Sequence, residues 1–482
     1  MVALRLSDRA IGLASLFVLA RLLIPADFGV IALANSMIAL LALMGAFGLE
    51  TALIQNQRAG KAHFDTVFTF NVLFGLAMAI ALAALAKPTA QFYGDDRIVN
   101  VVLVLACARL IGAFQNVGLV YFRKDLAFDK EFRFVFFKRV VVTFAVTLPL
   151  AFYFRDYRAL VIGTLVGSVV GLVLSYYLHP YRPSFGLRAW RELFGFSKWM
   201  LATSVVGVVS GRAADFIIGR LAGIGALGVF SLSREIAMLP SSELAAPMNR
   251  AVFSGYARLS GDIAALRQGY LKVVSVLSLV VLPAGVGLCL VASPVVHLLL
   301  GQKWLEAIPI IRILAIEGVL VVGLSTAHYI YLAIGQPDKL TKVLGVQAVV
   351  SITLMLAMIP KFGLVGAALA RVAASIVTAP INLKIVARAL EMPLLNVVVA
   401  VRRALMATAV MSIAVLLLQS VWASVVTPAA LVAHLAASVL IGMCTYALAI
   451  FCLWHIAGRP DGAERFVLQR VQSLFLKLRR TG

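Results

Sequence analysis

The chain has 482 residues, of which 62% are hydrophobic and only 13% are charged. A soluble globular domain averages about 45–50% apolar and about 25% charged residues, so this composition excludes an ordinary soluble fold. The formal net charge of +22 would suit a nucleic-acid-binding protein, but the positions of the basic residues argue against that class. We therefore expect a polytopic membrane protein without a sizeable soluble domain.

Apolar segments long enough to cross a bilayer recur along the whole chain. A bilayer core about 30 Å thick requires about 20 apolar residues in a helix, and irregular backbone cannot face lipid. Spans are expected at about 6–24, 28–54, 64–86, 98–122, 134–153, 158–178, 195–220, 226–252, 270–292, 306–333, 340–359, 363–389, 401–421 and 430–454. The predicted fold is an all-α membrane protein with about 14 transmembrane helices. The N-terminal residues run into the first span without an A-x-A-like cleavage site, so we expect that span to be retained.

Basic residues gather in the loops that follow even-numbered spans, whereas the alternate loops are short and nearly neutral. The basic loops and the tail contain Arg58, Lys61, Arg123, Lys124, Lys130, Arg133, Arg182, Arg188, Arg191, Arg258, Arg267, Lys339, Lys342, Arg388, Arg402, Arg403, Arg465, Arg470, Lys477, Arg479 and Arg480. Positive residues collect in cytoplasmic loops, so both termini are predicted to be cytoplasmic. The basic surplus then reflects topology and anionic lipid, and we expect no nucleic-acid partner.

An internal repeat relates the two halves of the chain. ARLLIPADFGVIALA (20–34) aligns without a gap with GRLAGIGALGVFSLS (219–233), which pairs Gly29 with Gly228 at an offset of 199 residues. Two weaker matches follow at offsets of 203 and 204 residues. Because six is even, two six-helix lobes have the same orientation, which is a parallel repeat of the kind found in transporters. The alternative is that glycine and proline are simply common in membrane hairpins.

The repeat divides the chain into four predicted parts. We expect an N-terminal six-helix lobe at 1–180, a C-terminal six-helix lobe at 181–390, two appended helices at 391–456, and a basic amphipathic cytoplasmic tail at 457–482. The tail alternates basic and apolar residues at helical spacing, which is typical of a helix lying on the membrane surface.

Several charged residues fall inside the predicted spans. An ionised side chain at the bilayer centre costs at least about 2.5–3.5 kcal/mol, so it needs a partner or a water-filled cavity. Arg109, Arg312 and Arg371 are expected at comparable depth, and the first two occupy repeat-equivalent positions. With Arg234 they are candidates for a basic substrate-binding cavity between the lobes, since guanidinium groups bind phosphate in bidentate fashion. The alternative is that they pair with acids elsewhere in the bundle.

A second set of intramembrane charges is predicted to serve ion coupling or gating. Its members are Glu50, Arg212, Asp215, Glu235 and Glu317. Arg212 and Asp215 are i,i+3 neighbours on one helix face, and Arg212 and Glu235 should lie at similar depth. They form either an ion-pair cluster that locks the hairpin or part of the coupling machinery. A proton or a sodium ion is the candidate coupling ion.

Other polar and sulfur-containing residues carry weaker signals. Asn35, Gln115, Asn116, Ser204 and Ser210 are candidates for sugar specificity if they line the cavity. The four cysteines have no metal or redox spacing and are expected to be small buried residues. We therefore expect no cofactor and no bound metal.

The sequence resembles the polysaccharide transporters of the MOP exporter superfamily, and among them the Wzx-type exporters of lipopolysaccharide and exopolysaccharide repeat units. The stretches that carry the resemblance are ARLLIPADFGVIALA, GLETALIQ (48–55), YRALVIG (157–163), HPYRPSFGLRAWRELFGFSKWM (179–200), DFIIGRLAGIGALGVFSLSREIAMLP (215–240), GQKW (301–304) and GLVGAALAR (363–371).

This resemblance implies that the chain flips an undecaprenyl-pyrophosphate-linked oligosaccharide across a bacterial inner membrane by alternating access. The lipid tail would stay in the bilayer while a basic cavity holds the pyrophosphate and sugars. Membrane lipids, a polysaccharide polymerase and the glycosyltransferases of the same pathway would be its other partners.

Four rival interpretations compete with this one. An enzyme would need a catalytic surface outside the bilayer, and neither that surface nor a Walker loop is evident, so no enzymatic activity is expected. A MATE-like cation-coupled drug exporter would favour acids over arginines in its cavity, whereas a flippase for a cell-wall precursor lipid shares the predicted architecture. A scaffold would have no reason to bear the insertion cost of the buried charges.

Overall fold

The structure is a computed structural model whose described part is entirely helical in its regular elements, which confirms the all-α class. It describes residues 2–45, 49–56, 58–125, 127–190, 198–245, 252, 255–256, 258–259, 261–422, 428–459 and 464–465. The chain packs into two compact units, Met1–Ser231 (unit 1) and Leu232–Gly482 (unit 2). Helix α12 (Ile224–Ala237) contains the boundary between them.

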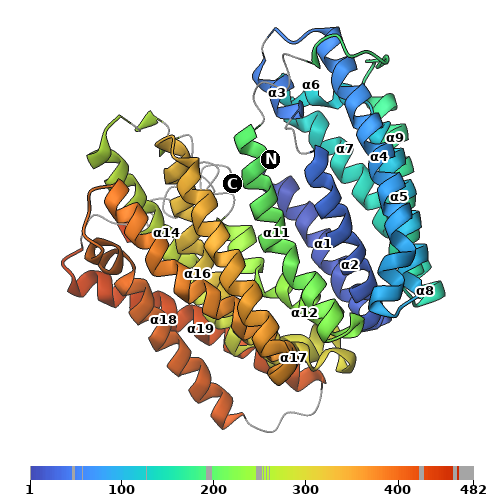
Figure 1. Cartoon of the computed structure of the whole chain (residues 1–482). Helices are drawn as coiled ribbons and strands as arrows, with labels where there is room; N and C mark the ends of the chain where they lie inside the picture. The colour runs from blue at the N-terminus through green and yellow to red at the C-terminus, as the bar shows by residue number, and fades with distance from the viewer. Residues whose placement is uncertain are drawn as a thin grey trace, which may run out of the picture. The chain divides into compact units, whose positions relative to one another are not determined.

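Unit 1 is a bundle in which α4, α5 and α9 pack side by side (Figure 1). In chain order, the elements of unit 1 before α12 are α1 (Val2–Leu22), α2 (Pro25–Ala42), η1 (Leu43–Gly45), α3 (Leu49–Gln55), α4 (Lys61–Tyr93), α5 (Arg97–Ala113), η2 (Val117–Leu119), α6 (Val120–Lys124), α7 (Phe128–Val140), η3 (Val141–Thr147), α8 (Leu148–Phe154), α9 (Arg158–Leu178) and α11 (Lys198–Leu221). Helix α2 packs against both α5 and α11.

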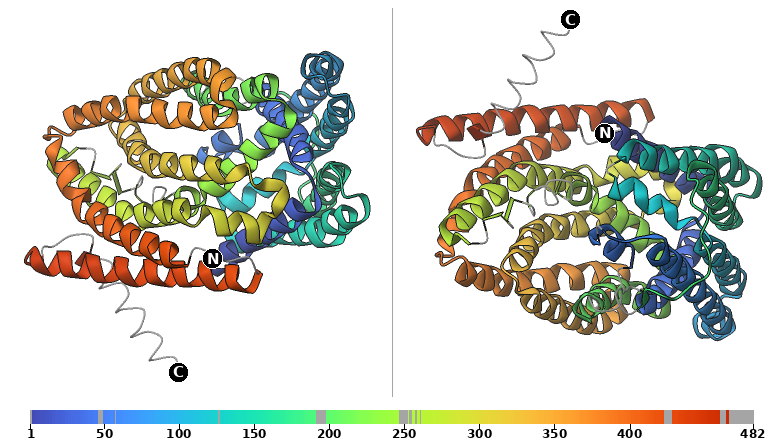
Figure 2. Two further views of the ribbon diagram at one scale, coloured as in Figure 1. Left: turned by 90° about the horizontal axis from the view of Figure 1, so that it is seen from below. Right: turned by 90° about the horizontal axis from the view of Figure 1, so that it is seen from above.

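Unit 2 is built around α14, which packs against α16 and α18. Its elements after α12 are η4 (Ser241–Ala245), α14 (Ile263–Leu290), α15 (Ala292–Val295), η5 (Val296–Leu300), η6 (Gln302–Trp304), α16 (Ala307–Ala333), α17 (Pro337–Ala389), α18 (Leu395–Val421) and α19 (Pro428–Ile456). Figure 2 shows α19, the red helix, running beside α18, in agreement with their packing.

Over the residues that the structure describes, the predicted spans coincide with a helix or with a short series of helices. Nine described helices are long and apolar enough to cross a membrane, and the bent pair Arg97–Ala113 and Val117–Lys124 would make a tenth. Three helices that match predicted spans are not among the nine: α1 and α11 carry several charged residues, and α12 has only 14 described residues. Helix α17 holds two predicted spans, divided at Gly363, whose positive φ of 57° suits glycine. These helices are consistent with the predicted count of fourteen, which stays a prediction.

Large apolar side chains are exposed over much of the helical surface, as a lipid-facing protein requires. They include Ile80, Val173, Val349, Leu417 and Met443. Cys107, Cys444 and Cys452 are exposed as well, so the expectation that all four cysteines are buried was wrong. The apolar runs around these three cysteines face outward. An apolar neighbourhood did not indicate burial, because the lipid-facing positions of a membrane helix are as apolar as its core positions.

The two stretches of the internal repeat meet each other through their glycines. A Cβ atom added to Gly29 would lie 1.8 Å from the carbonyl oxygen of Ile224, and one added to Gly228 would lie 1.8 Å from that of Pro25. All four residues belong to unit 1. Pro25 aligns with Ile224 at the same offset that relates the glycines. The contact is therefore reciprocal, as expected for a pair related by an approximate two-fold axis, and it supports the gapless alignment. The four-part division at residues 180, 390 and 456 stays a prediction.

Replacing Gly29 by alanine should force α2 and α12 apart, because the new methyl group overlaps a backbone carbonyl that cannot rotate away. Overpacking of this kind costs about 1–3 kcal/mol of folding free energy. We expect Gly29→Ala in detergent to unfold at a lower temperature than the wild type, as measured by size-exclusion chromatography after heating. Gly225→Ala is the matched control, since it lies on α12 with nothing within 4 Å of an added Cβ. Equal unfolding temperatures for the two variants would contradict the close approach.

Candidate functional site

Unit 1 contains a cavity of about 820 Å³ enclosed by α2, α4, α5, α7, η3 and α9. This volume lies within the range of about 300–1,000 Å³ that is usual for ligand pockets. Three basic residues line it, and two of them are Arg109 from α5 and Lys138 from α7. Neither forms an ion pair with a carboxylate of the described chain. Both charges are therefore available to an anion that enters the cavity.

The third basic residue of the cavity, Arg139, is already paired. Its Nη1 atom lies 3.1 Å from Oδ2 of Asp8 on α1. Gly12 makes room for this pair, because a Cβ at that position would fall 2.2 Å from Nη2 of Arg139. Arg139 thus fixes α1 against α7, whereas Arg109 and Lys138 remain the ligand-facing cations.

A stripe of glycines on α9 opens the space that the cavity occupies. A Cβ on Gly163 would lie 2.3 Å from Oγ1 of Thr147, and one on Gly171 would lie 2.8 Å from Nε2 of Gln115 and 2.9 Å from Nζ of Lys138. Opposite this stripe the chain forms the π-helical stretch η3, a feature frequent at functional sites. Close helix packing, which the GTLVGSVVG stretch (163–171) predicts, thereby leaves polar groups beside the cavity.

A second, smaller cavity of about 210 Å³ shares part of its wall with the first. It is lined by Glu50 from α3, by Arg123 from α6 and by Glu131 from α7. Nε of Arg123 lies 2.6 Å from Oε1 of Glu131, and its Nη1 lies 3.5 Å from Oε2 of Glu50. Glu50, predicted to serve coupling or gating, is therefore a half-exposed member of a three-residue ion cluster.

The chain breaks between α5 and α6 at the point where the two cavities meet. The helices Arg97–Ala113 and Val117–Lys124 are bent by 67° at this break. Asn116, which is buried, satisfies the freed backbone: its Oδ1 accepts from the N–H of Gly118, and its own N–H donates to Oγ of Ser175. Irregular backbone inside a membrane is tolerated only where it is buried or lines a cavity. Asn116 thus has a structural role at the break, and it also lines the smaller cavity, so its role in sugar specificity stays a prediction.

The segment after α9 ties this break to α4. Nδ2 of Asn116 donates to the carbonyl of Tyr181 at 2.7 Å, and the hydroxyl of Tyr181 donates to Asp65. Asp65 also accepts from the N–H of Ser184 at 2.9 Å and from its hydroxyl at 2.6 Å. Burial and the carboxylate of Asp65 together raise the pKa of Tyr181, so the phenol stays a donor. These bonds hold the break in one position.

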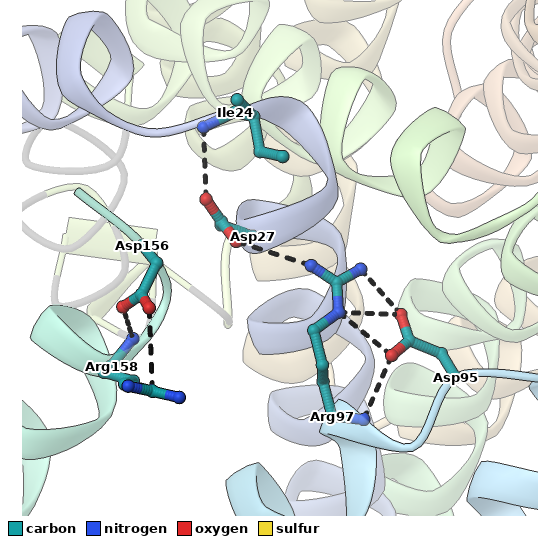
Figure 3. A network of polar contacts seen from close by, with 6 residues as sticks. All are labelled: Ile24, Asp27, Asp95, Arg97, Asp156 and Arg158. Atoms are coloured by element: carbon teal, nitrogen blue, oxygen red, sulfur yellow. Dashed lines mark hydrogen bonds and ion pairs between the residues drawn. The ribbon is translucent and has the colours of Figure 1, made fainter. Parts of the chain in front are cut away.

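At the opposite end of unit 1, a network joins the turns that lead into α2 and α5 (Figure 3). Oδ2 of Asp27, a buried residue of the repeat, accepts from the N–H of Ile24 at 3.2 Å, and its Oδ1 lies 3.5 Å from Arg97. Arg97 also holds Asp95 at 2.7 Å, and this hydrogen-bonded pair lowers the pKa of the Asp95 carboxyl. The helices that enclose the cavity are thus fixed at both ends.

The predicted cation Arg371 and the predicted acid Glu317 form a bidentate pair within unit 2. Nη2 of Arg371 lies 2.7 Å from Oε1 of Glu317, and its Nε lies 3.0 Å from Oε2. The side chain of Glu317 is only 1% exposed. This geometry agrees with the alternative raised from the sequence, namely that Arg371 pairs with an acid of the bundle. Arg312, five residues before Glu317 on α16, is exposed and has no ion pair with a described residue.

The remaining predicted charges lie on α11 and α12. Nη1 of Arg212 lies 3.4 Å from Oδ2 of Asp215, so the predicted i,i+3 pair is present, and the same carboxylate oxygen accepts from the hydroxyl of Ser36 on α2 at 2.6 Å. Arg234 is half-buried and Glu235 is exposed. The similar depth expected for Arg212 and Glu235, and the ion-pair cluster that would include them, stay predictions.

Truncating Glu317 should destabilise unit 2, since it would remove the buried carboxylate that pairs with the half-buried Arg371. Breaking one side of a buried ion pair costs about 3–5 kcal/mol, whereas replacing both partners by apolar residues is often neutral. We expect Glu317→Leu to lower the unfolding temperature in detergent and the double variant Glu317→Leu/Arg371→Leu to recover most of it. Arg312→Leu on the same helix is the control and should unfold like the wild type. A double variant as unstable as the single one would contradict a simple pair.

Arg109 and Gln115, both singled out from the sequence, line the large cavity of unit 1, whereas Lys138 and Asn71, which also line it, were missed. The sequence placed the basic cavity between the two lobes, and that placement stays a prediction. A signal for Lys138 was present, because it lies within the predicted span 134–153. Asn71, in the predicted span 64–86, could be recognised only once its neighbours were known. Of the other sugar candidates, Asn35 lines the large cavity, Ser210 lines neither of these two cavities, and the side chain of Ser204 lies outside the described part of the structure.

Comparison with known proteins now becomes informative. Residues 18–309 match the family described as "Polysaccharide biosynthesis protein". The chain belongs to this family. The matched region includes both cavities, the break and both stretches of the internal repeat.

Two curated relatives of this family member are bacterial. The chain is 25% identical over 314 residues to the lipopolysaccharide biosynthesis protein WzxC of Escherichia coli (strain K12), which covers 64% of each chain. It is 28% identical over 295 residues to the teichuronic acid biosynthesis protein TuaB of Bacillus subtilis (strain 168), which covers 60% of this chain and 61% of TuaB. The alignments therefore span less than two thirds of these relatives.

Solved structures establish the fold of this polysaccharide biosynthesis family member. The lipid II flippase MurJ in an inward closed conformation aligns with a TM-score of 0.74 at 13% identity, covering 95% of this chain and 99% of MurJ. A multidrug resistance MATE family transporter of the MOP superfamily, in an inward-facing conformation, aligns with a TM-score of 0.63 at 18% identity, covering 80% and 94% of the two chains. The chain thus shares the fold of these two proteins, and its many apolar helices make it a multi-pass membrane protein.

Proposed function

We propose that the chain flips a diphosphate-linked lipid oligosaccharide between the leaflets of a bacterial inner membrane, for lipopolysaccharide or exopolysaccharide synthesis. The observation that carries the proposal is the pair Arg109 and Lys138, which line the large cavity without ion pairs to described carboxylates. Two cations that line one cavity repel each other and favour an anion between them. The family and the relatives named for polysaccharide synthesis support a sugar-bearing anion.

In this mechanism the diphosphate enters the cavity while the lipid tail remains in the bilayer. Arg109 contributes a planar fork that can hold two phosphate oxygens, and Lys138 contributes a point charge. The substrate then crosses the membrane when the protein alternates between inward-open and outward-open states. We propose no enzymatic step, because flipping breaks no covalent bond of the substrate.

Coupling to an ion is part of the same proposal. Asp215 is fully buried, and its carboxylate interacts with Ser36 and Arg212. Binding of a proton or a sodium ion to this carboxylate would weaken both interactions. Such a change would loosen α11 from α2. Both termini are proposed to be cytoplasmic, on the charge distribution of the loops. The polymerase and glycosyltransferases of the pathway are proposed partners.

A cationic drug is a poorer substrate for this cavity. Drug cations need acids, and the acidic residues of unit 1 named above are paired with arginines or lie in the smaller cavity, except Asp65, whose carboxylate is held by Tyr181 and Ser184. A cell-wall precursor lipid also carries a diphosphate, so the charge of the cavity does not distinguish it from a polysaccharide repeat unit. An experiment must distinguish the two substrates.

Complementation tests the proposal. In the native host, deletion of the gene should abolish surface polysaccharide and cause lipid-linked repeat units to accumulate, while the level of cell-wall precursor lipid stays unchanged. Arg109→Ala and Lys138→Ala, each losing charge-assisted hydrogen bonds worth about 1.5–3 kcal/mol, should lower transport by about 10- to 150-fold. Arg109→Lys and Lys138→Arg should keep part of the activity.

The matched control is Arg133→Ala, because Arg133 is exposed on α7 and lines neither cavity. It should transport like the wild type at equal expression. Full activity of Arg109→Ala and Lys138→Ala would contradict the site, and normal polysaccharide in the deletion strain would contradict the function.

A further inference from the structure

The two cavities of unit 1 differ in the charge of their walls. The larger contains the cations Arg109 and Lys138, and the smaller contains two acids, Glu50 and Glu131, around one base, Arg123. With two acids and one base, the side chains that line the smaller cavity therefore have a net negative formal charge. An anion that suits the larger cavity is disfavoured in the smaller one, so the two take chemically different parts of a ligand.

Two amide side chains stand in the wall that the cavities share. Asn71 on α4 and Gln115 at the break after α5 each line both cavities. Both are half-buried, and neither side chain hydrogen-bonds to another described residue. Because Asn116 and Ser175 satisfy the backbone at the break, Gln115 is not needed as a cap. Its amide is left to a ligand or to water.

The size and chemistry of the smaller cavity suit a sugar. Its volume of about 210 Å³ corresponds to roughly seven waters at ~30 Å³ each, which is room for a single ring rather than for an oligosaccharide. Amides both donate and accept hydrogen bonds, and carboxylates accept them, which is the combination that hydroxyl groups need. The carboxylates would repel the acid group of a uronic acid.

We propose that the smaller cavity is the subsite for the sugar attached directly to the diphosphate, and that it selects an uncharged sugar. Asn71 and Gln115 are its specificity-determining residues, since they stand where the diphosphate and the first sugar would meet. The acids Glu50 and Glu131 exclude an acidic sugar. This inference rests on the proposed function, because it assumes that the larger cavity takes the diphosphate.

Binding measurements on the purified full-length protein in lipid nanodiscs test the subsite. The probes are undecaprenyl diphosphate without sugar, the same lipid carrying one N-acetylhexosamine, and the same lipid carrying one hexuronic acid. The wild type should bind the N-acetylhexosamine form most tightly. Asn71→Ala and Gln115→Ala should each weaken binding of that form by about 2- to 12-fold, the effect of one lost neutral hydrogen bond, and should leave binding of the sugar-free lipid unchanged.

The outcomes separate this inference from the function on which it rests. If Arg109→Ala weakens binding of all three probes while the amide variants weaken binding of the N-acetylhexosamine form and spare the sugar-free lipid, both proposals hold. If the amide variants bind every probe like the wild type, or lose the sugar-free lipid equally, the subsite is wrong and the flippase stands. If the wild type binds none of the probes, the proposed function fails first.

The acids have their own readout. Glu50→Gln and Glu131→Gln keep the shape of the side chains and remove the charge. They should therefore reduce the ratio of the affinity for the N-acetylhexosamine form to the affinity for the hexuronic acid form. An unchanged preference would overturn the role of the carboxylates. Asn35→Ala, which alters an amide of the large cavity only, is the matched control and should leave the preference unchanged.

Discussion

The constraint on which this structure depends is the cost of an unsatisfied charge inside a lipid bilayer. It sorts the charged residues of the spans into two groups. Glu317 with Arg371, and Asp215 with Arg212, resolve the cost by pairing across or along helices. Arg109 and Lys138 resolve it by facing a cavity instead. Only the second arrangement leaves charge for a ligand, which is why two residues among many buried charges define the site.

The same constraint governs the backbone. A helix can break inside the membrane only if other groups take over its hydrogen bonds, and at residues 114–116 Asn116 and Ser175 do so. The break turns Gln115 toward the space between the two cavities, and the glycines of α9 leave that space open. Cavity, break and glycine stripe therefore form one arrangement, in which small residues and capping side chains let polar groups gather within an apolar bundle.

Much of the fold could be predicted from the sequence, because apolar segment length and the positions of glycine are local properties. The spans coincide with helices, and the repeat anticipated which glycines are equivalent. The site was predicted only in part. Arg109 was found from its cost in the bilayer, but the same reasoning grouped it with Arg371, which is paired. Pairing depends on which helices are neighbours, and a single sequence does not contain that information. Asn71 was missed for the same reason, since an amide within a span gives no signal until its surroundings are known.

The reciprocal contact of Gly29 and Gly228 has a consequence for how the two halves of the chain can diverge. Each glycine accommodates the carbonyl of the residue four positions before the other, so neither half can acquire a side chain there while the other keeps its position. Elsewhere the two halves differ, since unit 1 has a basic cavity and unit 2 has a closed ion pair. At this crossing, steric exclusion keeps both positions as glycine.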